Sequence, residues 1–202
     1  GNVMNVLLIS AKTEHPSGGI AIWTSHYLDG CKEIKNFSCD LVNVAVRGRR
    51  AVCATAKRSL KDEFFRTYEI IKQLNERLKH GIYDIAHLNT NVGTFGIIRD
   101  YIIAKKIERK GIPLILHFHC DIQRWVKNRI TKHFLKKILK ISNMNYVLCE
   151  SSRYYLHDVF NAESKKVSNF VDENLVLVSK PIREHIQKVM FVGRVSANKG
   201  AK

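Results

Sequence analysis

The feature that most constrains the fold lies near the start of the chain, where an apolar run is followed by glycine and then by an amphipathic segment. Residues 3–10 (VMNVLLIS) are rich in Val, Leu and Ile, which is typical of a strand buried on both faces. Residues 20–34 carry apolar side chains at helical spacing. Between them lie Gly18 and Gly19, whose backbone can approach a ligand because no Cβ intervenes. Strand, glycine turn and helix form the first half of a nucleotide-binding βαβ unit, and the entrance of such a helix favours an anion.

The spacing of the glycines excludes two common nucleotide-binding motifs. The dinucleotide fingerprint needs G-x-G-x-x-G and an acid about 20 residues further on. Here the glycines are adjacent, and the second predicted strand is followed by Arg47-Gly-Arg-Arg50 with no acid. A P-loop needs Lys-Ser or Lys-Thr after the glycines, and this chain has neither there. A turn that simply needs a positive φ angle is the second interpretation of this glycine pair.

The rest of the chain alternates predicted strands with predicted helices. Strands are expected at 39–46, 83–88, 113–118, 146–149 and 166–170, and helices at 57–80, 95–110, 124–141 and 151–160. This alternation predicts an α/β fold with a Rossmann-like, doubly wound parallel sheet. In the helix at 57–80, an apolar stripe is expected to face the core, and Gly81 is expected to be its C-cap. The stripe consists of Leu60, Phe64, Tyr68, Ile71, Leu74 and Leu78.

Composition limits the classes of partner. The 202 residues include 34 Lys and Arg against 18 Asp and Glu, a net charge of +16, which implies an anionic partner such as nucleic acid, anionic lipid or a phosphorylated substrate.

Five scattered cysteines without a C-x-x-C pair indicate free, buried thiols in a reducing compartment. His117 and His119 share one face of a predicted strand, but no third ligand is near in sequence, so no metal is expected. No apolar run is long enough to cross a bilayer, and a cytoplasmic location is expected.

The end of the chain carries a second anion-binding pattern. A new strand is predicted at 188–192, and within FVGRVSANKG (residues 191–200) Arg194 and Lys199 lie in a glycine-flanked loop that suits a diphosphate. This segment resembles the FVGRL-x-x-x-KG signature that opens the C-terminal domain of family 4 glycosyltransferases of the GT-B fold. The resemblance implies that Arg194 and Lys199 hold the pyrophosphate of a nucleotide-sugar donor, with Gly18 and Gly19 beside the same phosphates.

Two further segments match the family in order along the chain. Phe118-His119 ends a predicted strand where the family often has an active-site histidine that contacts the donor sugar, so the resemblance makes His119 the candidate catalytic residue. Asn169-Phe-Val-Asp172 is similar to the family's N-G-V-D turn, with Phe170 in place of glycine. The implied domains are an N-terminal acceptor-side domain, 1–187, and the first strand and loop of a C-terminal donor-binding domain, 188–202.

The activity implied by the resemblance is transfer of a sugar, with retention, by a hexosyltransferase-type enzyme of cell-surface polysaccharide synthesis. The donor is a nucleotide sugar, the acceptor is a glycan or a lipid-linked glycan, and no cofactor is needed. The family's E-x7-E segment, which serves the donor site, has no counterpart in these 202 residues. The isolated chain is therefore expected to be inactive.

The acceptor is expected to lie against two loops, Thr90–Phe95 and Asp121–Trp125, with Asn91, Asp121 and Trp125 as contacts. For Asp121, capping of the following helix is the favoured alternative.

Residues 121–141 combine an apolar stripe with many basic residues, and two interpretations carry equal weight. In the first, the helix lies on an anionic membrane surface at the inner face of the membrane. In the second, it is an ordinary core-packed helix with a solvated basic face. The residues expected to face the membrane in the first case are Trp125, Lys132, Lys136, Lys137 and Lys140.

Three other functions are weighed against the glycosyltransferase. A basic nucleic-acid-binding α/β domain accounts for the charge but not for the glycine turn or the tail. An NADP-dependent oxidoreductase would use Arg47, Arg49 and Arg50 for the 2′-phosphate, but its glycine spacing is absent. A non-catalytic acceptor-binding or assembly subunit is the third. No nucleic-acid partner is expected for this chain.

Overall fold

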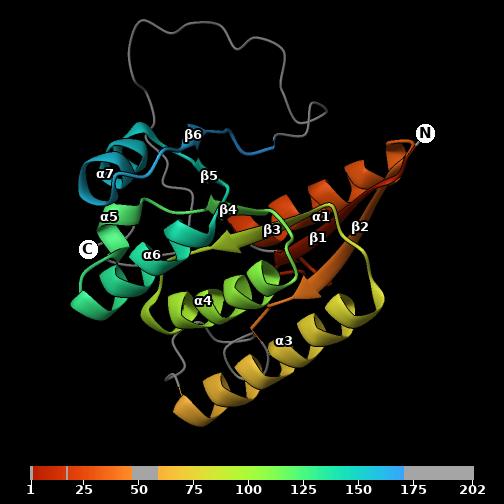
Figure 1. Ribbon diagram of the computed structural model, residues 1–202, viewed down its shortest axis with the longest axis horizontal. Coiled ribbons are helices and arrows are strands. Elements are labelled where there is room, and N and C mark those ends of the chain that lie inside the picture. Colours follow the sequence, from red (N-terminus) through yellow and green to blue (C-terminus); the bar gives the residue numbers. More distant parts are fainter. Residues whose placement is uncertain (1, 17, 47–58, 171–202) are drawn as a thin grey trace, which may run out of the picture. The chain divides into compact units, whose positions relative to one another are not determined.

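The computed structural model describes residues 2–16, 18–46 and 59–170, which belong to one compact unit that ends at Phe170 (Figure 1). Its strands are β1 (Met4–Ser10), β2 (Phe37–Asn43), β3 (Ile85–Thr90), β4 (Leu114–Phe118), β5 (Met144–Val147) and β6 (Lys165–Lys166). Its helices are α1 (Gly19–Glu33), α3 (Leu60–His80), α4 (Thr94–Arg109), α5 (Ile122–Trp125), α6 (Arg129–Ile141) and α7 (Glu150–Phe160).

Within the described residues, the six strands form one all-parallel sheet in the order β2-β1-β3-β4-β5-β6. The chain runs from β1 outward to β2, returns past β1 to β3, and then continues in one direction to β6. The direction of winding therefore reverses between β1 and β3. The predicted α/β fold with a Rossmann-like parallel sheet is confirmed, and a six-strand sheet of this kind places the ends of β1, β3 and β4 at one edge.

The two faces of the sheet differ in chemistry. Helices α3, α4 and α6 cover one face (Figure 1), where the apolar core includes Leu7 and Ile9 of β1 packed with Leu74 of α3 and Ile97 of α4. Helix α1 packs against the other face, because Thr24 of α1 is hydrogen-bonded to Ser10 at the end of β1. On this second face the sheet carries polar and aromatic side chains, which contribute to the candidate site.

Helix α3 buries only part of the predicted stripe. Leu74 and Leu78 are buried as expected, but Leu60, Phe64 and Tyr68 are exposed, Phe64 by 83%. The buried position in this half of the helix is Glu63, whose carboxylate lies 3.8 Å from the guanidinium groups of both Arg66 and Arg99. An ion-pair cluster therefore occupies the contact between α3 and α4 where the sequence predicted apolar packing.

The helix predicted at 124–141 is divided. Residues 122–125 form the single turn α5, and α6 begins only after Asn128, whose side-chain oxygen accepts a hydrogen bond from the Thr131 amide at 2.7 Å. Such an N-cap favours a new helix start over continuation of an existing helix. The strand predicted at 166–170 is also shorter, because β6 comprises only Lys165 and Lys166.

Gly81 ends α3 as predicted, and its amide donates to the Arg77 carbonyl at 2.8 Å, although its φ of −103° is not left-handed. A Cβ at this position would lie 2.5 Å from the ring of Tyr83. The Tyr83 hydroxyl in turn donates to Asp40 Oδ2 at 2.6 Å, so the ring cannot move without breaking this hydrogen bond.

We therefore expect Gly81→Ala to lower the free energy of unfolding by about 1–3 kcal/mol, as overpacking does, measured by urea denaturation. Gly30→Ala, inside α1, is the matched control, because no atom of the part of the chain that the structure describes lies within 4 Å of its Cβ position. That change should raise the free energy of unfolding by about 0.5–1 kcal/mol. Equal effects of the two substitutions would contradict the steric explanation.

Candidate functional site

Three segments meet at the carboxyl edge of the sheet, around the point where the winding reverses. Gly18 and Gly19 follow β1, Asn91 follows β3, and His119 follows β4. The His119 amide donates to the Thr90 carbonyl at 3.1 Å, which holds the end of β4 beside the end of β3. In open parallel sheets, ligands bind at this position.

The glycine turn leaves the start of α1 open. Gly18 has a φ of +91°, which an L side chain rarely adopts, so the interpretation as a turn that needs positive φ is correct for this residue. Gly19 is the first residue of α1, and no described residue lies within 4 Å of the position that its Cβ would take. Helix α1 has no side-chain cap hydrogen bond and no acid in its first turn. Among the described residues, no side chain therefore caps the positive end of α1, and the binding of an anion there stays a prediction.

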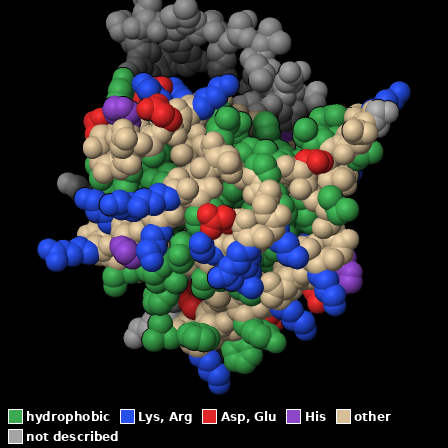
Figure 2. Space-filling model, in the orientation of Figure 1, with side chains coloured by type: hydrophobic (Ala, Val, Ile, Leu, Met, Phe, Trp, Pro, Cys, Tyr) green, Lys and Arg blue, Asp and Glu red, His purple; other side chains and the backbone are tan. Residues whose placement is uncertain are grey.

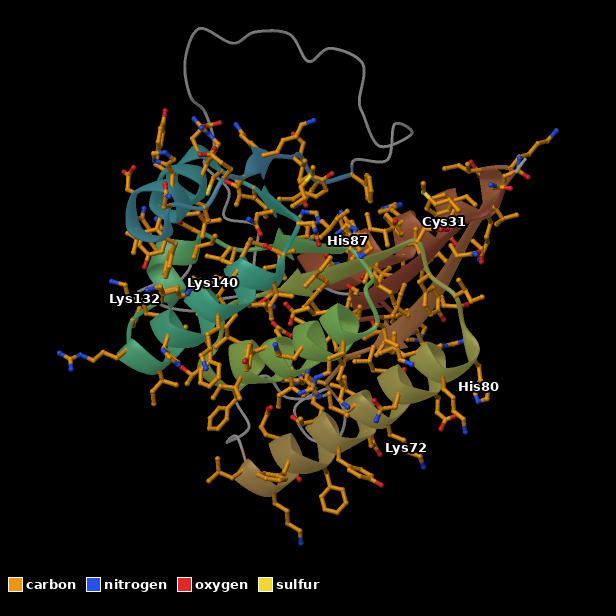
Figure 3. The ribbon with its side chains drawn as sticks, viewed as in Figure 1. Cys31, Lys72, His80, His87, Lys132 and Lys140 are labelled. Carbon is orange, nitrogen blue, oxygen red and sulfur yellow. The ribbon has the colours of Figure 1, made fainter. Side chains whose placement is uncertain are left out.

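Trp23, one turn into α1, connects the glycine turn to the histidines. Its side chain is only 4% exposed, and its ring centroid lies 5.3 Å from each of the rings of His87, His117 and His119. Phe170 stacks on the same indole with centroids 5.4 Å apart. Trp23, in the second turn of α1, and His119 therefore belong to one cluster of rings on the α1 face of the sheet. Figure 3 labels His87, another member of this cluster.

The three histidines are held in the neutral form. Burial lowers the pKa of His87 to about 3 and that of His117 to about 4, and the neighbouring His117 lowers the pKa of His87 further. Burial also lowers the pKa of His119 to about 3, and His117 and His87 act in the same direction. At neutral pH these rings can donate and accept hydrogen bonds without carrying charge, so His119 is not poised as an acid.

The two loops predicted to bind the acceptor lie side by side. The Cys120 thiol donates to the Asn91 carbonyl at 3.4 Å, which joins the loop after β4 to the loop after β3. Asp121 occupies the N-cap position of α5, but its side chain makes no cap hydrogen bond, so the favoured capping role is wrong. Its carboxylate instead accepts from Ser151 at 3.3 Å and pairs with Arg124 at 3.2 Å. Trp125 is 54% exposed beside this loop.

The basic helix α6 combines features of both interpretations. Its Leu135 and Ile138 are fully buried in the core, as in an ordinary packed helix. Lys132, Lys136 and Lys140 are exposed, and Figure 2 shows Lys and Arg side chains over the face that α4 and α6 present to the viewer. Lys137 is also exposed but lies over the Tyr101 ring of α4, 5.3 Å from its centroid. Trp125 and Ile130 do not continue the buried stripe, because both are more than half exposed.

Several predictions fall on residues that the structure does not describe. These are the roles of Arg194 and Lys199, the domain boundary between 187 and 188, the Asp172 end of the N-G-V-D-like turn, and the basic loop at 47–50. Of the cysteines, the four described ones are free, as predicted, but they are half-buried rather than fully buried. Within the described ranges, no helix has the length and apolarity to span a bilayer, and no three His, Cys, Asp or Glu side chains are grouped to hold a metal ion.

Sequence reasoning missed most of the ring cluster. Asn89 and His117 lie in register on adjacent strands, so His87, Asn89 and His117 share one face of the sheet. The available signal was the period-two placement of polar residues in two otherwise apolar strands. Trp23 was expected only as one of the apolar side chains at helical spacing in residues 20–34, because the sequence does not show which strand a helix residue will contact.

The comparisons with known proteins find only distant similarity. No family model matches the sequence, and no curated protein matches it. Among solved structures, one similar chain is a last common ancestor of HMPPK and PLK/HMPPK vitamin kinases, with a TM-score of 0.48, 9% identity, and coverage of 72% of this chain and 61% of that one. Another is LpCGTa in complex with UDP, with a TM-score of 0.42, 11% identity, and coverage of 86% of this chain and 55% of that one. The chain thus spans less than two thirds of either structure.

The neutral histidines predict a pH dependence of stability. In the unfolded chain a histidine takes up its proton near pH 6.5, whereas in the folded protein His87 does so only near pH 3. The unfolded state therefore binds more protons as the pH falls below about 6.5, and stability decreases towards pH 4 by up to about 1.4 kcal/mol per pH unit for each such ring.

The measurement is urea denaturation between pH 7.5 and pH 4.5, with His87→Gln as the comparison. Buried Asp100 acts in the opposite direction, because burial raises its pKa to about 6, so the difference between the two proteins isolates the contribution of His87. We expect a shallower decrease in the variant. An identical slope in both proteins would show that His87 is not buried in the neutral form.

Proposed function

We propose that this chain is the acceptor-side N-terminal domain of a retaining GT-B glycosyltransferase, of the hexosyltransferase type, that uses a nucleotide sugar. One observation carries the proposal: Trp23 joins the open glycine start of α1 and His119 in a single cluster at the reversal point of the sheet. An open helix start offers amides to a diphosphate, and the neutral imidazole nearby offers hydrogen bonds to an uncharged sugar.

In this proposal two sets of residues hold the diphosphate. Gly18 and Gly19 offer it the first amides of α1. Arg194 and Lys199, which the sequence resemblance assigns to the pyrophosphate, neutralise its charge. Stabilising the charge of the leaving diphosphate in this way needs no metal and no further cofactor. His119 is neutral and acts by hydrogen bonding to the donor sugar rather than by proton transfer.

The test is isothermal titration calorimetry of the chain with UDP, GDP and ADP, with inorganic phosphate as the reference ligand. In Gly19→Val the new side chain meets none of the described residues within 4 Å of its Cβ, so we expect it to obstruct a ligand and not the fold. We expect the variant to bind the preferred nucleoside diphosphate about tenfold more weakly or worse, a loss of about 1.4 kcal/mol. Its midpoint of thermal unfolding should stay within about 2 °C of the parent.

Gly30→Ala, in the same helix and away from the glycine turn, is the control and should bind as the parent does. Equal nucleotide affinity in Gly19→Val and the parent would refute the role of the helix start. Salt-dependent retention of nucleic acid, with no nucleotide binding, would instead favour the nucleic-acid-binding alternative.

The acceptor in this proposal is a glycan or a lipid-linked glycan of cell-surface polysaccharide synthesis. It lies against the adjoining loops that carry Asn91, Asp121 and Trp125. The exposed lysines of α6 and the exposed Trp125 then face an anionic membrane, which places a cytoplasmic enzyme at the inner membrane face. The donor half of the site belongs to the C-terminal domain, so the isolated chain is inactive in this proposal.

Vesicle sedimentation tests the membrane contact. Charge reversal of Lys132, Lys136 and Lys140 to Glu should reduce binding to phosphatidylglycerol vesicles at least about tenfold, because each basic residue contributes about 1 kcal/mol at an anionic surface. Charge reversal of Lys61, Lys72 and Lys79 to Glu on α3, of which Figure 3 labels Lys72, is the control with the same change in net charge and should reduce binding far less. Equal losses in the two proteins would point to net charge alone, and binding to neutral phosphatidylcholine would contradict the electrostatic mechanism.

A further inference from the structure

Helices α3 and α4, which run along the apolar face of the sheet (Figure 1), both end at its amino edge. Helix α3 ends at His80, shortly before β3 begins at Ile85, and α4 ends at Arg109, shortly before β4 begins at Leu114. Because β3 and β4 are adjacent and parallel, their first residues lie at one edge of the sheet. The two helix ends are therefore at the opposite edge from the candidate functional site.

A hollow of about 360 Å³ lies between the last turns of these helices, and most of its lining is cationic. The four cations are Lys79 of α3 and Lys106, Arg109 and Lys110 from the end of α4. The other two lining residues are Asn75 and Leu78, and among the described residues no acid lines this α3–α4 hollow.

The cations of the hollow differ from other cations of the same two helices, which are paired with acids. Arg77 lies 3.8 Å from Asp40, and Lys105 lies 2.7 Å from Glu108. Within the part of the chain that the structure describes, none of the four lining cations forms an ion pair. Three of them are also close together on α4, at spacings of three and four residues where like charges repel each other.

The helix macrodipole explains only part of this arrangement. Cations near a helix C-terminus are favourable, because each helix end acts as about half of a negative charge. The ends of α3 and α4 together thus offset about one of the four positive charges, and roughly three remain in excess. A hollow lined by one sign of charge concentrates the electrostatic potential and attracts ions of the opposite sign.

We propose that the α3–α4 hollow is a binding site for an anion with two or more linked phosphate groups. A phosphate group carries a charge of about −1.5 to −2 at neutral pH, so two linked groups match the excess positive charge better than one does. Arg109 suits phosphate oxygens through its planar fork of donors, and the lysines and Asn75 add further donors.

The size of the hollow favours a compact anion over a nucleic acid. Its volume is at the lower end of the range of roughly 300–1,000 Å³ for small-molecule sites. An extended nucleic-acid backbone is instead held by basic residues spread along a groove or a face. The hollow shares no residue with the proposed nucleotide-sugar site, and this inference does not rest on the proposed function.

The experiment is isothermal titration calorimetry of the chain with inorganic pyrophosphate, with inorganic phosphate as the comparison. We expect pyrophosphate to bind at least about tenfold more tightly than phosphate, because it engages cations of both helices. Its affinity should fall as potassium chloride is added, because salt screens exposed charges. The absence of pyrophosphate binding to the parent protein overturns the proposal.

Two double variants with the same change in net charge separate this site from the overall charge. Lys79→Gln with Arg109→Gln removes one lining cation from each helix and should weaken pyrophosphate binding at least about tenfold. Lys72→Gln with Lys105→Gln removes one cation from each helix outside the hollow and should change the affinity by less than about twofold. Equal losses in the two double variants overturn the proposal.

Thermal unfolding shows whether the lining cations serve only the helix ends. Pyrophosphate should raise the unfolding midpoint of the parent, because a ligand that binds only the folded state stabilises it, and should do so much less in Lys79→Gln with Arg109→Gln. A lower midpoint in that variant without pyrophosphate, combined with no effect of pyrophosphate on the parent, assigns these cations to the helix macrodipole and overturns the proposal.

Two further titrations separate this site from the other candidate ligands and sites. If Gly19→Val abolishes pyrophosphate binding while Lys79→Gln with Arg109→Gln retains it, the anion binds at the start of α1 and the proposal fails. If a short DNA duplex binds through the lining cations and pyrophosphate does not bind, the partner is a nucleic acid and the proposal also fails. If pyrophosphate binds in the hollow but no nucleoside diphosphate binds at the start of α1, this site stands and the proposed function fails.

Discussion

The packing of Trp23 against three imidazole rings is the contact on which the site depends. Without it, α1 would keep its hydrogen bond from Thr24 to Ser10 of β1, but no indole would join the first turns of the helix to His119 at the end of β4. The indole is almost fully buried, so the distances between the rings are set by close packing rather than by exposed hydrogen bonds. A helix start and a histidine that are far apart in sequence, Gly19 and His119, thereby occupy one edge of the sheet.

The chemistry of the sheet is divided between its two faces. One face is an aliphatic core under α3, α4 and α6, which supplies most of the hydrophobic stabilisation. The other carries Ser10, Asn89 and the histidines, where burial costs free energy unless each polar atom is paired. Such a cost is tolerated where the groups serve a function. The polar face is also the one that α1 covers.

Much of the fold follows from sequence patterns, and the exceptions have identifiable causes. The strands are short apolar runs separated by amphipathic segments, and this alternation alone specifies a parallel α/β sheet. The exposed Phe64 and the buried Glu63 were missed because periodicity cannot detect that an ion-pair cluster replaces apolar packing. The break before α6 was missed because Asn128 was not recognised as an N-cap inside an otherwise continuous helical pattern.

The position of the candidate site could be predicted from the sequence, but the side chains that surround His119 could not. Gly18, Gly19 and His119 stood out because they follow strands, and the structure places all three at the carboxyl edge of the sheet, with Trp23 of α1 packed on His119. The partners of His119 were not predictable, because strand order decides which residues lie in register, and that order is a tertiary property. Asn89 opposite His117 is the clearest example, since a whole helix separates them along the chain.

One edge of the sheet has a consequence for how copies of the protein meet. Strand β6 is only two residues long, and both residues are exposed lysines. An approaching strand from another molecule would find few free backbone groups there and would have to desolvate two ammonium groups. A short, cationic border of this kind opposes edge-to-edge association and the aggregation that follows from it.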